Sequence, residues 1–453
     1  MRARFALGAV SLFIAACASA SAPKAPIFTA PVGATPPEVA VSTPIVVTAP
    51  TAQRSPARLA ELFSEYERLI NSHAENVELA EIREAIDIAA GQRDAVTAGL
   101  FWYTDLARAL AEAKRTSRPV LSLRLLGRLD EELSCANSRY FRIALYANEA
   151  ISKLLRDGYV LHWQSERPVP RITVDFGDGR VVERTITGNS VHYVLDANGR
   201  VVDALPGLFG PVRFESALRD AQALAAETGP LTNAEAGKRI AQTHERMLWK
   251  RTAEWRKLMR VVDPTGVERA GVERIQLPAV GRVMKGEGSP LYVSLPATVV
   301  NELTVTKADG ETPLLALMQP ELRAISPRWG WNIAQPFLPR ETLDLQSRVL
   351  LRSKHPRDWS LPTAPPLDGA QFAARVAYFE KRLTVEGAVS EFALHSAIRQ
   401  KLVKEKVVDL AALDEYVYTS LFLSPANDAW LGLAPLEAVT GIDGDGIALA
   451  PHL

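Results

Sequence analysis

Cys135 and Ser138 are the residues whose types and spacing most directly suggest chemistry. They form a Cys-x-x-Ser sequence, Cys135-Ala136-Asn137-Ser138, at the predicted start of a helix. Backbone N–H groups without intrahelical partners and the helix dipole stabilise negative charge at that end of a helix, so a thiolate would be favoured. Because the thiolate is the nucleophilic form of cysteine, Cys135 could attack a partner's disulfide and form a mixed disulfide.

Ser138 limits what such a thiol could do. A second cysteine in that place would resolve the mixed disulfide, whereas a serine hydroxyl can only hydrogen-bond to the thiolate. Turnover would therefore need an external thiol or a partner protein. Two other interpretations stay open: Cys135 is buried and inert, because free cysteine is among the most buried residue types, or it reacts with peroxide through a sulfenic acid.

The N-terminal residues predict export from the cytoplasm. A short basic segment precedes the apolar stretch Phe5 to Ala16, which is too short to span a bilayer as a stable helix. The stretch ends in Ile14-Ala15-Ala16-Cys17, which resembles the lipobox of bacterial lipoproteins. That resemblance implies cleavage before Cys17, a lipid anchor on its sulfur, and a place on the periplasmic side of the outer membrane. The alternative is ordinary secretory cleavage after Ala20 or Ala22, which gives a periplasmic or secreted protein.

Composition and hydrophobic pattern divide the chain into five parts. Residues 1–16 are the predicted signal peptide, and residues 17–56, rich in Pro, Ala and Thr, predict a disordered tether. Apolar residues at three- and four-residue spacing predict a helical hairpin over residues 57–99. Residues 100–228 predict an α/β domain, and residues 230–453 predict a mainly helical domain to which the sequence assigns no role.

The bulk composition excludes several classes of partner and cofactor. The formal net charge is zero, so nothing argues for binding to nucleic acid. The seven histidines show no metal-ligand spacing, and no glycine-rich phosphate loop is present, so we expect neither a metal nor a cofactor. Both interpretations of the N-terminus leave Cys135 as the single thiol of the mature chain.

The predicted α/β domain alternates helices and strands in a recognisable order. Its expected elements are a helix over 105–115, strands over 120–126 and 159–163, a helix from 135 to about 156, hairpins over 172–182 and 191–202, and a helix over 212–227. This order resembles the thioredoxin-like superfamily. The resemblance rests on Trp102-x-x-Asp105-Leu106, on Arg118-Pro119-Val120-Leu121, on the Cys-x-x-Ser that opens a helix, and on Tyr193-Val194-Leu195-Asp196-x-x-Gly199-Arg200.

The resemblance implies an α/β thioredoxin-like domain, with helices flanking a layered sheet, followed by a mainly helical C-terminal domain. It implies monothiol exchange through Cys135 and Ser138 with protein thiols or disulfides of the envelope. Asn189, Ser190 and His192 would form the substrate-binding loop. The chain departs from the family at Ser190, where these oxidoreductases usually carry a cis-proline, and a non-proline cis bond is costly. The alternative is therefore a non-catalytic interaction protein, with both domains serving as binding surfaces.

Overall fold

A computed structural model describes residues 54–175, 177–179, 181–185, 189–262, 335–356 and 365–422. The predicted signal peptide, the lipidation site Cys17 and nearly all of the predicted tether lie outside these residues. The described residues all belong to one compact unit within Ala49–Leu453.

The first helices form a hairpin with a small core of its own. Helix α1 (Pro56–Asn71) begins at Ser55, whose hydroxyl accepts the backbone N–H of Arg58. Helix α2 (Asn76–Ala90) ends at Gly91, whose left-handed backbone, with a φ of 68°, closes the last turn. Their buried apolar residues, together with Ala95 of the short helix α3 (Ala95–Ala98), make a cluster separate from the main core. The helices match those expected between residues 57 and 90.

A mixed five-stranded sheet forms the centre of the fold. The strands lie in the order β1-β3-β2-β6-β7; β1, β3 and β2 are parallel, whereas β6 and β7 are antiparallel to their neighbours. Their bounds are Trp102–Tyr103, Val160–Arg167, Val120–Leu126, Ser190–Leu195 and Val201–Pro206, in that order across the sheet. Every residue of β2 is buried, because this central strand is covered on both faces.

Helices cover one face of the sheet. The sequence predicted a single helix in this layer, from residue 135 to about 156. The structure has instead helix α5 (Ala136–Tyr140), a π-helical turn η2 (Phe141–Leu145) and helix α6 (Glu149–Gly158). The prediction of one helix was wrong because Asn148 leaves the helical conformation and caps α6, its side chain accepting the backbone N–H of Ile151. Helix α7 (Pro211–Thr228) lies beside α6. Helix α4 (Leu106–Thr116) begins at Asp105 and contacts β3.

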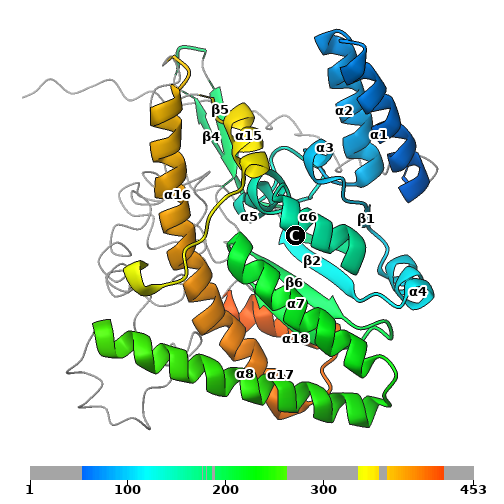
Figure 1. Ribbon diagram of the computed structural model, residues 1–453, viewed down its shortest axis with the longest axis vertical. Helices are drawn as coiled ribbons and strands as arrows, with labels where there is room; N and C mark the ends of the chain where they lie inside the picture. The colour runs from blue at the N-terminus through cyan, green and yellow to red at the C-terminus, as the bar shows by residue number, and fades with distance from the viewer. Residues whose placement is uncertain are drawn as a thin grey trace, which may run out of the picture. The chain divides into compact units, whose positions relative to one another are not determined.

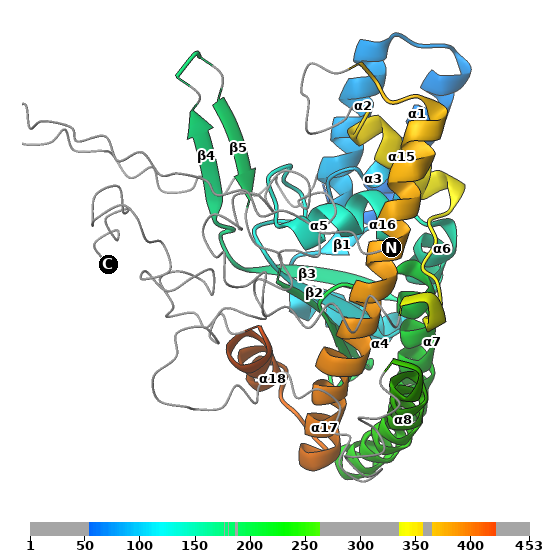
Figure 2. The same ribbon diagram turned by 90° about the vertical axis from the view of Figure 1, so that its left-hand side faces the viewer.

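A separate two-stranded sheet, β4 (Arg171–Asp175) and β5 (Val181–Thr185), follows β3. This hairpin projects away from the five-stranded sheet (Figure 2). No helix therefore connects β3 to β6 among the described residues between them.

The described parts of residues 230–453 are helical, as the sequence predicted. Helix α8 (Asn233–Val262) lies beside helix α17 (Ser396–Glu405) (Figure 1). The other elements are η4 (Gln335–Phe337), α15 (Leu345–Lys354), α16 (Gly369–Val389), η5 (Ser390–His395), α18 (Leu410–Tyr416) and η6 (Val417–Leu421). None of the helices in the described ranges is long and apolar enough to cross a membrane.

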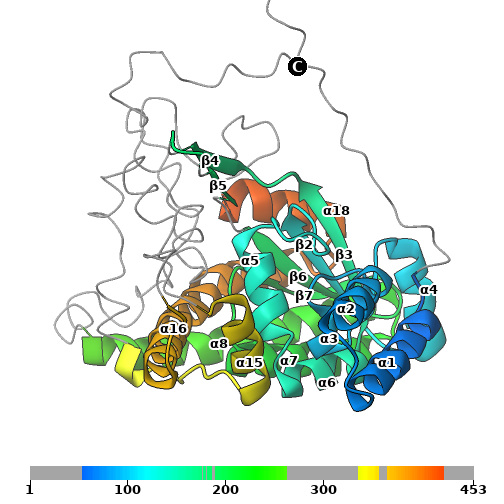
Figure 3. The same cartoon turned by 90° about the horizontal axis from the view of Figure 1, so that it is seen from above.

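These C-terminal helices share the hydrophobic core of the sheet. Leu402, Leu413 and Leu421 belong to the same buried cluster as Leu121 and Leu123 of β2. Helix α18 lies on the side of the sheet opposite α6 and α7 (Figure 3). It therefore covers the face that the hairpin β4–β5 leaves open.

Buried ion pairs join α7 to the C-terminal helices. The guanidinium of Arg213 bonds to Glu341 at 2.7 Å and to Glu391 at 3.1 Å. Arg251 of α8 bonds to the same Glu391 at 2.5 Å. The Arg213 side chain is only 5% exposed, so its loss would leave two carboxylates buried with fewer partners.

Replacing Arg213 tests whether these pairs hold the C-terminal helices in place. We expect Arg213→Met to lower the free energy of unfolding by about 3–5 kcal/mol, because it breaks a buried charge network from one side. Arg219→Met is the matched control on the same helix: its pair with Glu215 is exposed, so the change should stay below about 0.5 kcal/mol. Urea unfolding followed by circular dichroism measures both. Equal effects from the two variants would contradict this role.

Candidate functional site

The Cys-x-x-Ser sequence lies where β2 leads into α5. Cys135 is the N-cap residue of α5, and its sulfur accepts the backbone N–H of Ser138 at 3.4 Å. The backbone N–H of Cys135 donates to the carbonyl of Leu126, at the end of β2, at 3.4 Å. The thiol thus lies at the start of a helix, in the position that favours a negatively charged sulfur.

The whole motif is closed to solvent. Cys135, Asn137 and Ser138 each have a relative exposure of 0%. The Ser138 hydroxyl is buried and has no hydrogen-bond partner among the described residues. The expectation that this hydroxyl bonds to the sulfur is therefore wrong, since the backbone N–H of the same residue makes that bond. A buried hydroxyl without a partner costs about 1–3 kcal/mol.

The start of β6 and the residue before it pack against this motif. Asn189 and Ser190 are both fully buried, and the side-chain amide of Asn137 donates to the Ser190 hydroxyl at 2.8 Å. The peptide bond before Ser190 is trans, because the described residues contain no cis bond. A polar bond between motif and loop thus occupies the place expected to contact a substrate peptide.

His192 does not line a substrate-binding loop. It lies within β6 at 1% exposure, with Nε2 2.6 Å from the hydroxyl of Tyr146 and its ring packed between those of Phe141 and Phe214. Burial lowers its pKa to about 3, so the imidazole is neutral near pH 7. His192 is a core residue whose Nε2 contacts Tyr146, while its buried Nδ1 has no hydrogen-bond partner among the described residues.

Residues distant in the chain cover the thiol. Thr185, the last residue of β5, donates to the carbonyl of Ser134 at 3.1 Å and accepts from Arg139 at 3.1 Å. Tyr418 of η6 is buried, and burial is the main cause that raises the pKa of its hydroxyl, followed by the nearby Asp414, Glu166 and Cys135. The sequence pattern contained no signal for either residue, because long-range packing alone brings them to the site.

The acidic loop before Cys135 is tied down by basic side chains. Asp130 pairs with Arg128 at 2.8 Å, and Glu132 bonds to Arg93 at 3.3 Å. Arg142, which is 1% exposed, donates to the Ser134 hydroxyl at 3.2 Å. The acidic side chains that precede Cys135 are therefore paired with basic ones, and opening this loop would break several of these bonds.

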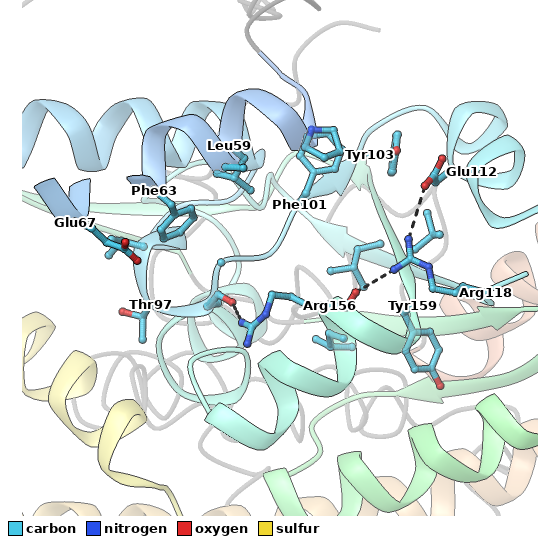
Figure 4. Close-up of a pocket in the computed structure, with 18 residues that line it drawn as sticks. Leu59, Phe63, Glu67, Thr97, Phe101, Tyr103, Glu112, Arg118, Arg156 and Tyr159 are labelled. Carbon is cyan, nitrogen blue, oxygen red and sulfur yellow. Dashed lines mark hydrogen bonds and ion pairs between the residues drawn. The ribbon is translucent and has the colours of Figure 1, made fainter. Parts of the chain in front are cut away.

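A second candidate site is a cavity of about 540 Å³ beside α1. Its apolar wall includes Leu59, Phe63 and Phe101, and Arg118 and Arg156 lie at its polar side (Figure 4). Arg118 donates to the carbonyl of Arg156 at 3.0 Å, and Arg156 donates to the carbonyl of Ala98. Both cations are already bonded to the protein, so this cavity would select a ligand mainly by apolar contact.

One hydrogen bond between β6 and α18 involves a carboxyl group whose pKa is raised. The hydroxyl of Tyr193 in β6 donates to Asp414 of α18 at 2.8 Å. Burial, together with the neighbouring Glu166, raises the pKa of Asp414 to about 7. The folded protein therefore keeps a proton on this carboxyl that the unfolded chain releases above about pH 4.

Asp414→Asn tests this protonation. Because the folded-state pKa is raised, the stability of the natural protein should fall as pH rises from about 4 to 7 through this group. The variant has no proton to lose, so it should gain about 1–2 kcal/mol relative to the natural protein between pH 4.5 and 8, a figure reduced for partial exposure. Urea unfolding at the two pH values measures the difference, with exposed Glu415→Gln as the control. A gap independent of pH would refute the assignment.

Comparisons with known proteins do not indicate a function. No protein-family model matches the chain, and no curated protein or solved structure matches it either. The described residues also contain no cluster of three or more histidine, cysteine or acidic side chains that could hold a metal ion.

Proposed function

We propose that the chain is a non-catalytic, thioredoxin-like interaction protein of the cell envelope, in which the Cys-x-x-Ser sequence has a structural role. The observation that carries the proposal is the complete burial of Cys135 and Ser138. Disulfide exchange needs a partner sulfur to reach the attacking sulfur, and access is one of the quantities that set its rate. A thiol sealed in the core lacks that access.

The order of elements supports the thioredoxin-like assignment. Strand β2 is followed by α5, which opens at the Cys-x-x-Ser, then by β3, the hairpin β6–β7 and α7. The loop carrying Ser190 contacts the motif through Asn137, as the resemblance implies for the loop before the third strand. The hydrogen bond between these two side chains supports a structural role, because it fills the contact surface that a substrate would need.

An interaction protein needs binding surfaces away from Cys135. The cavity beside α1 has the size of ordinary ligand sites and combines an apolar wall with a polar side. It is lined by residues of α1 and of the α/β layer together. A ligand there would contact both α1 and the α/β layer.

Alkylation of Cys135 tests the structural role of the thiol. In a Cys17→Ser background, we expect native Cys135 to react at least about a hundredfold more slowly than a cysteine introduced at exposed Ser64, because reaction requires the protein to open. In denaturant the two rates should become equal. A native Cys135 that reacts as fast as the introduced thiol would sink the proposal.

A second candidate is monothiol exchange by a transiently opened form. The observation that favours it is the bond from the Ser138 backbone N–H to the sulfur, which places the thiol at a helix N-terminus. The two candidates differ in one measurable quantity. Acid-quenched protein should carry a mixed disulfide at Cys135 if exchange occurs, and none if the thiol is structural.

We further propose that lipid on Cys17 anchors the protein to a membrane. Replacing this residue, as Cys17→Ala, should move the protein from the membrane fraction to the soluble envelope fraction, because the modified sulfur is lost. Fractionation followed by immunoblotting measures the change. An unchanged distribution would instead support ordinary secretory cleavage after Ala20 or Ala22.

A further inference from the structure

A small basic cavity lies among α7, α8 and α17. It has a volume of about 230 Å³, and its polar lining includes Arg246, Lys250 and Arg251 of α8, Arg399 of α17 and Asp220 of α7. We propose that this basic cavity binds a phosphate group, either as inorganic phosphate or as a small phosphomonoester. The proposal is independent of Cys135 and goes beyond the interaction role.

The residues of α8 reach the cavity because they share one face of the helix. Thr243, Arg246, Lys250 and Arg251 follow at spacings of three, four and one residues, which keeps them within one stripe of an α-helix. Arg246 donates to the Thr243 hydroxyl at 3.2 Å. Three cations of α8 thus line the cavity, and Arg399 of α17 is a fourth.

Arg399 is the observation that points to a ligand. Its side chain is 2% exposed, yet it lines the cavity. Its Nε and Nη1 atoms are buried and have no hydrogen-bond partner among the described residues. An ionised group that is buried without hydrogen bonds costs several kcal/mol, so this side chain needs an acceptor that the neighbouring helices do not provide.

The acids near Arg399 are already engaged or lie at the rim. Asp203 accepts from His395 at 2.8 Å, and Glu391 accepts from both Arg213 and Arg251. Asp220 is exposed and is the single carboxylate in the lining. Arg251 is already paired with Glu391 and Glu254. Arg246, Lys250 and Arg399 still outnumber the one carboxylate in the lining, which makes the potential in the cavity positive and favours an anion.

The size and the donors of the cavity narrow the class of anion. The volume is below that of sites for drug-sized ligands, so only a small group fits. Phosphate offers several acceptor oxygens around one centre, and clusters of arginine bind it through charge-assisted hydrogen bonds. The Thr243 hydroxyl could add a neutral donor at the same place.

The competing explanation is that Arg399 only stabilises the nearby carboxylate of Asp203. Arg399 is one of the charges that lower the pKa of Asp203, after His395 and His244. That role needs no ligand, and it predicts no response to phosphate. Titration with phosphate therefore separates the two explanations.

The test is calorimetric titration of the purified full chain with sodium phosphate and, separately, with glycerol phosphate, at constant ionic strength set by chloride. We expect saturable binding of at least one of them, and a Kd at least about tenfold higher in Arg399→Met and Lys250→Met, because each removes one cation. Arg239→Met is the matched control: it lies on α8 outside the cavity and pairs with Glu227. Its Kd should stay within about twofold of the natural value.

Each result of this test decides the proposal. Tighter binding of glycerol phosphate supports a phosphomonoester, and tighter binding of inorganic phosphate supports the free anion. Lys250 is exposed, so its variant keeps the test valid if Arg399→Met fails to fold. Absence of saturable binding, or binding that Lys250→Met leaves unchanged, would overturn the site.

Discussion

The central strand β2 must be covered on both of its faces, and the rest of the structure depends on this constraint. All seven of its residues are buried, so other parts of the chain must pack against both of its faces. Helices α5, α6 and α7 cover one face. The chain then places the hairpin β4–β5, which projects away from the sheet, between β3 and β6. The C-terminal elements α18 and η6 supply the missing layer, and their Leu413, Val417 and Leu421 enter the core of the sheet.

Polar bonds rather than apolar contact alone fix where these C-terminal elements bind. Tyr193 bonds to Asp414, and Arg213 bonds to Glu341 and Glu391. Apolar surfaces can slide past each other at little cost. A buried charge or hydroxyl, in contrast, loses its hydrogen-bond partner when the elements shift, and a buried polar group without a partner is costly in free energy. Two polar residues within β2 follow the same rule: Ser122 bonds to His162 and Arg124 to Glu166, so the buried strand carries no isolated charge.

The sequence predicted the elements that have a regular period and missed what long-range packing decides. Alternating or continuous apolar runs placed β2, β3 and the hairpins, and three- and four-residue spacing placed α1, α2 and α7. The two-residue strand β1 is too short to show a hydrophobic period. The helix break at Asn148 depends on its side chain capping α6, and a capping asparagine cannot be told from other polar residues in the sequence. The helix-start position of Cys135 was predictable from its neighbours, whereas its burial was not, because Thr185 and Tyr418 come from distant parts of the chain.

Two opposing effects act on the charge of the Cys135 sulfur, and burial also limits access to it. The helix N-terminus favours a negative sulfur by about 0.3–1 kcal/mol in ordinary settings and by about 2 kcal/mol in partly buried ones. Removing a charge from water costs several kcal/mol even after the protein relaxes. At 0% exposure a partner sulfur cannot reach this sulfur in the closed structure, so access limits its chemistry. At the start of α5 the backbone N–H of Ser138 bonds to this buried sulfur. Exchange at the sulfur would require the residues that cover it, Thr185 and Tyr418 among them, to move first.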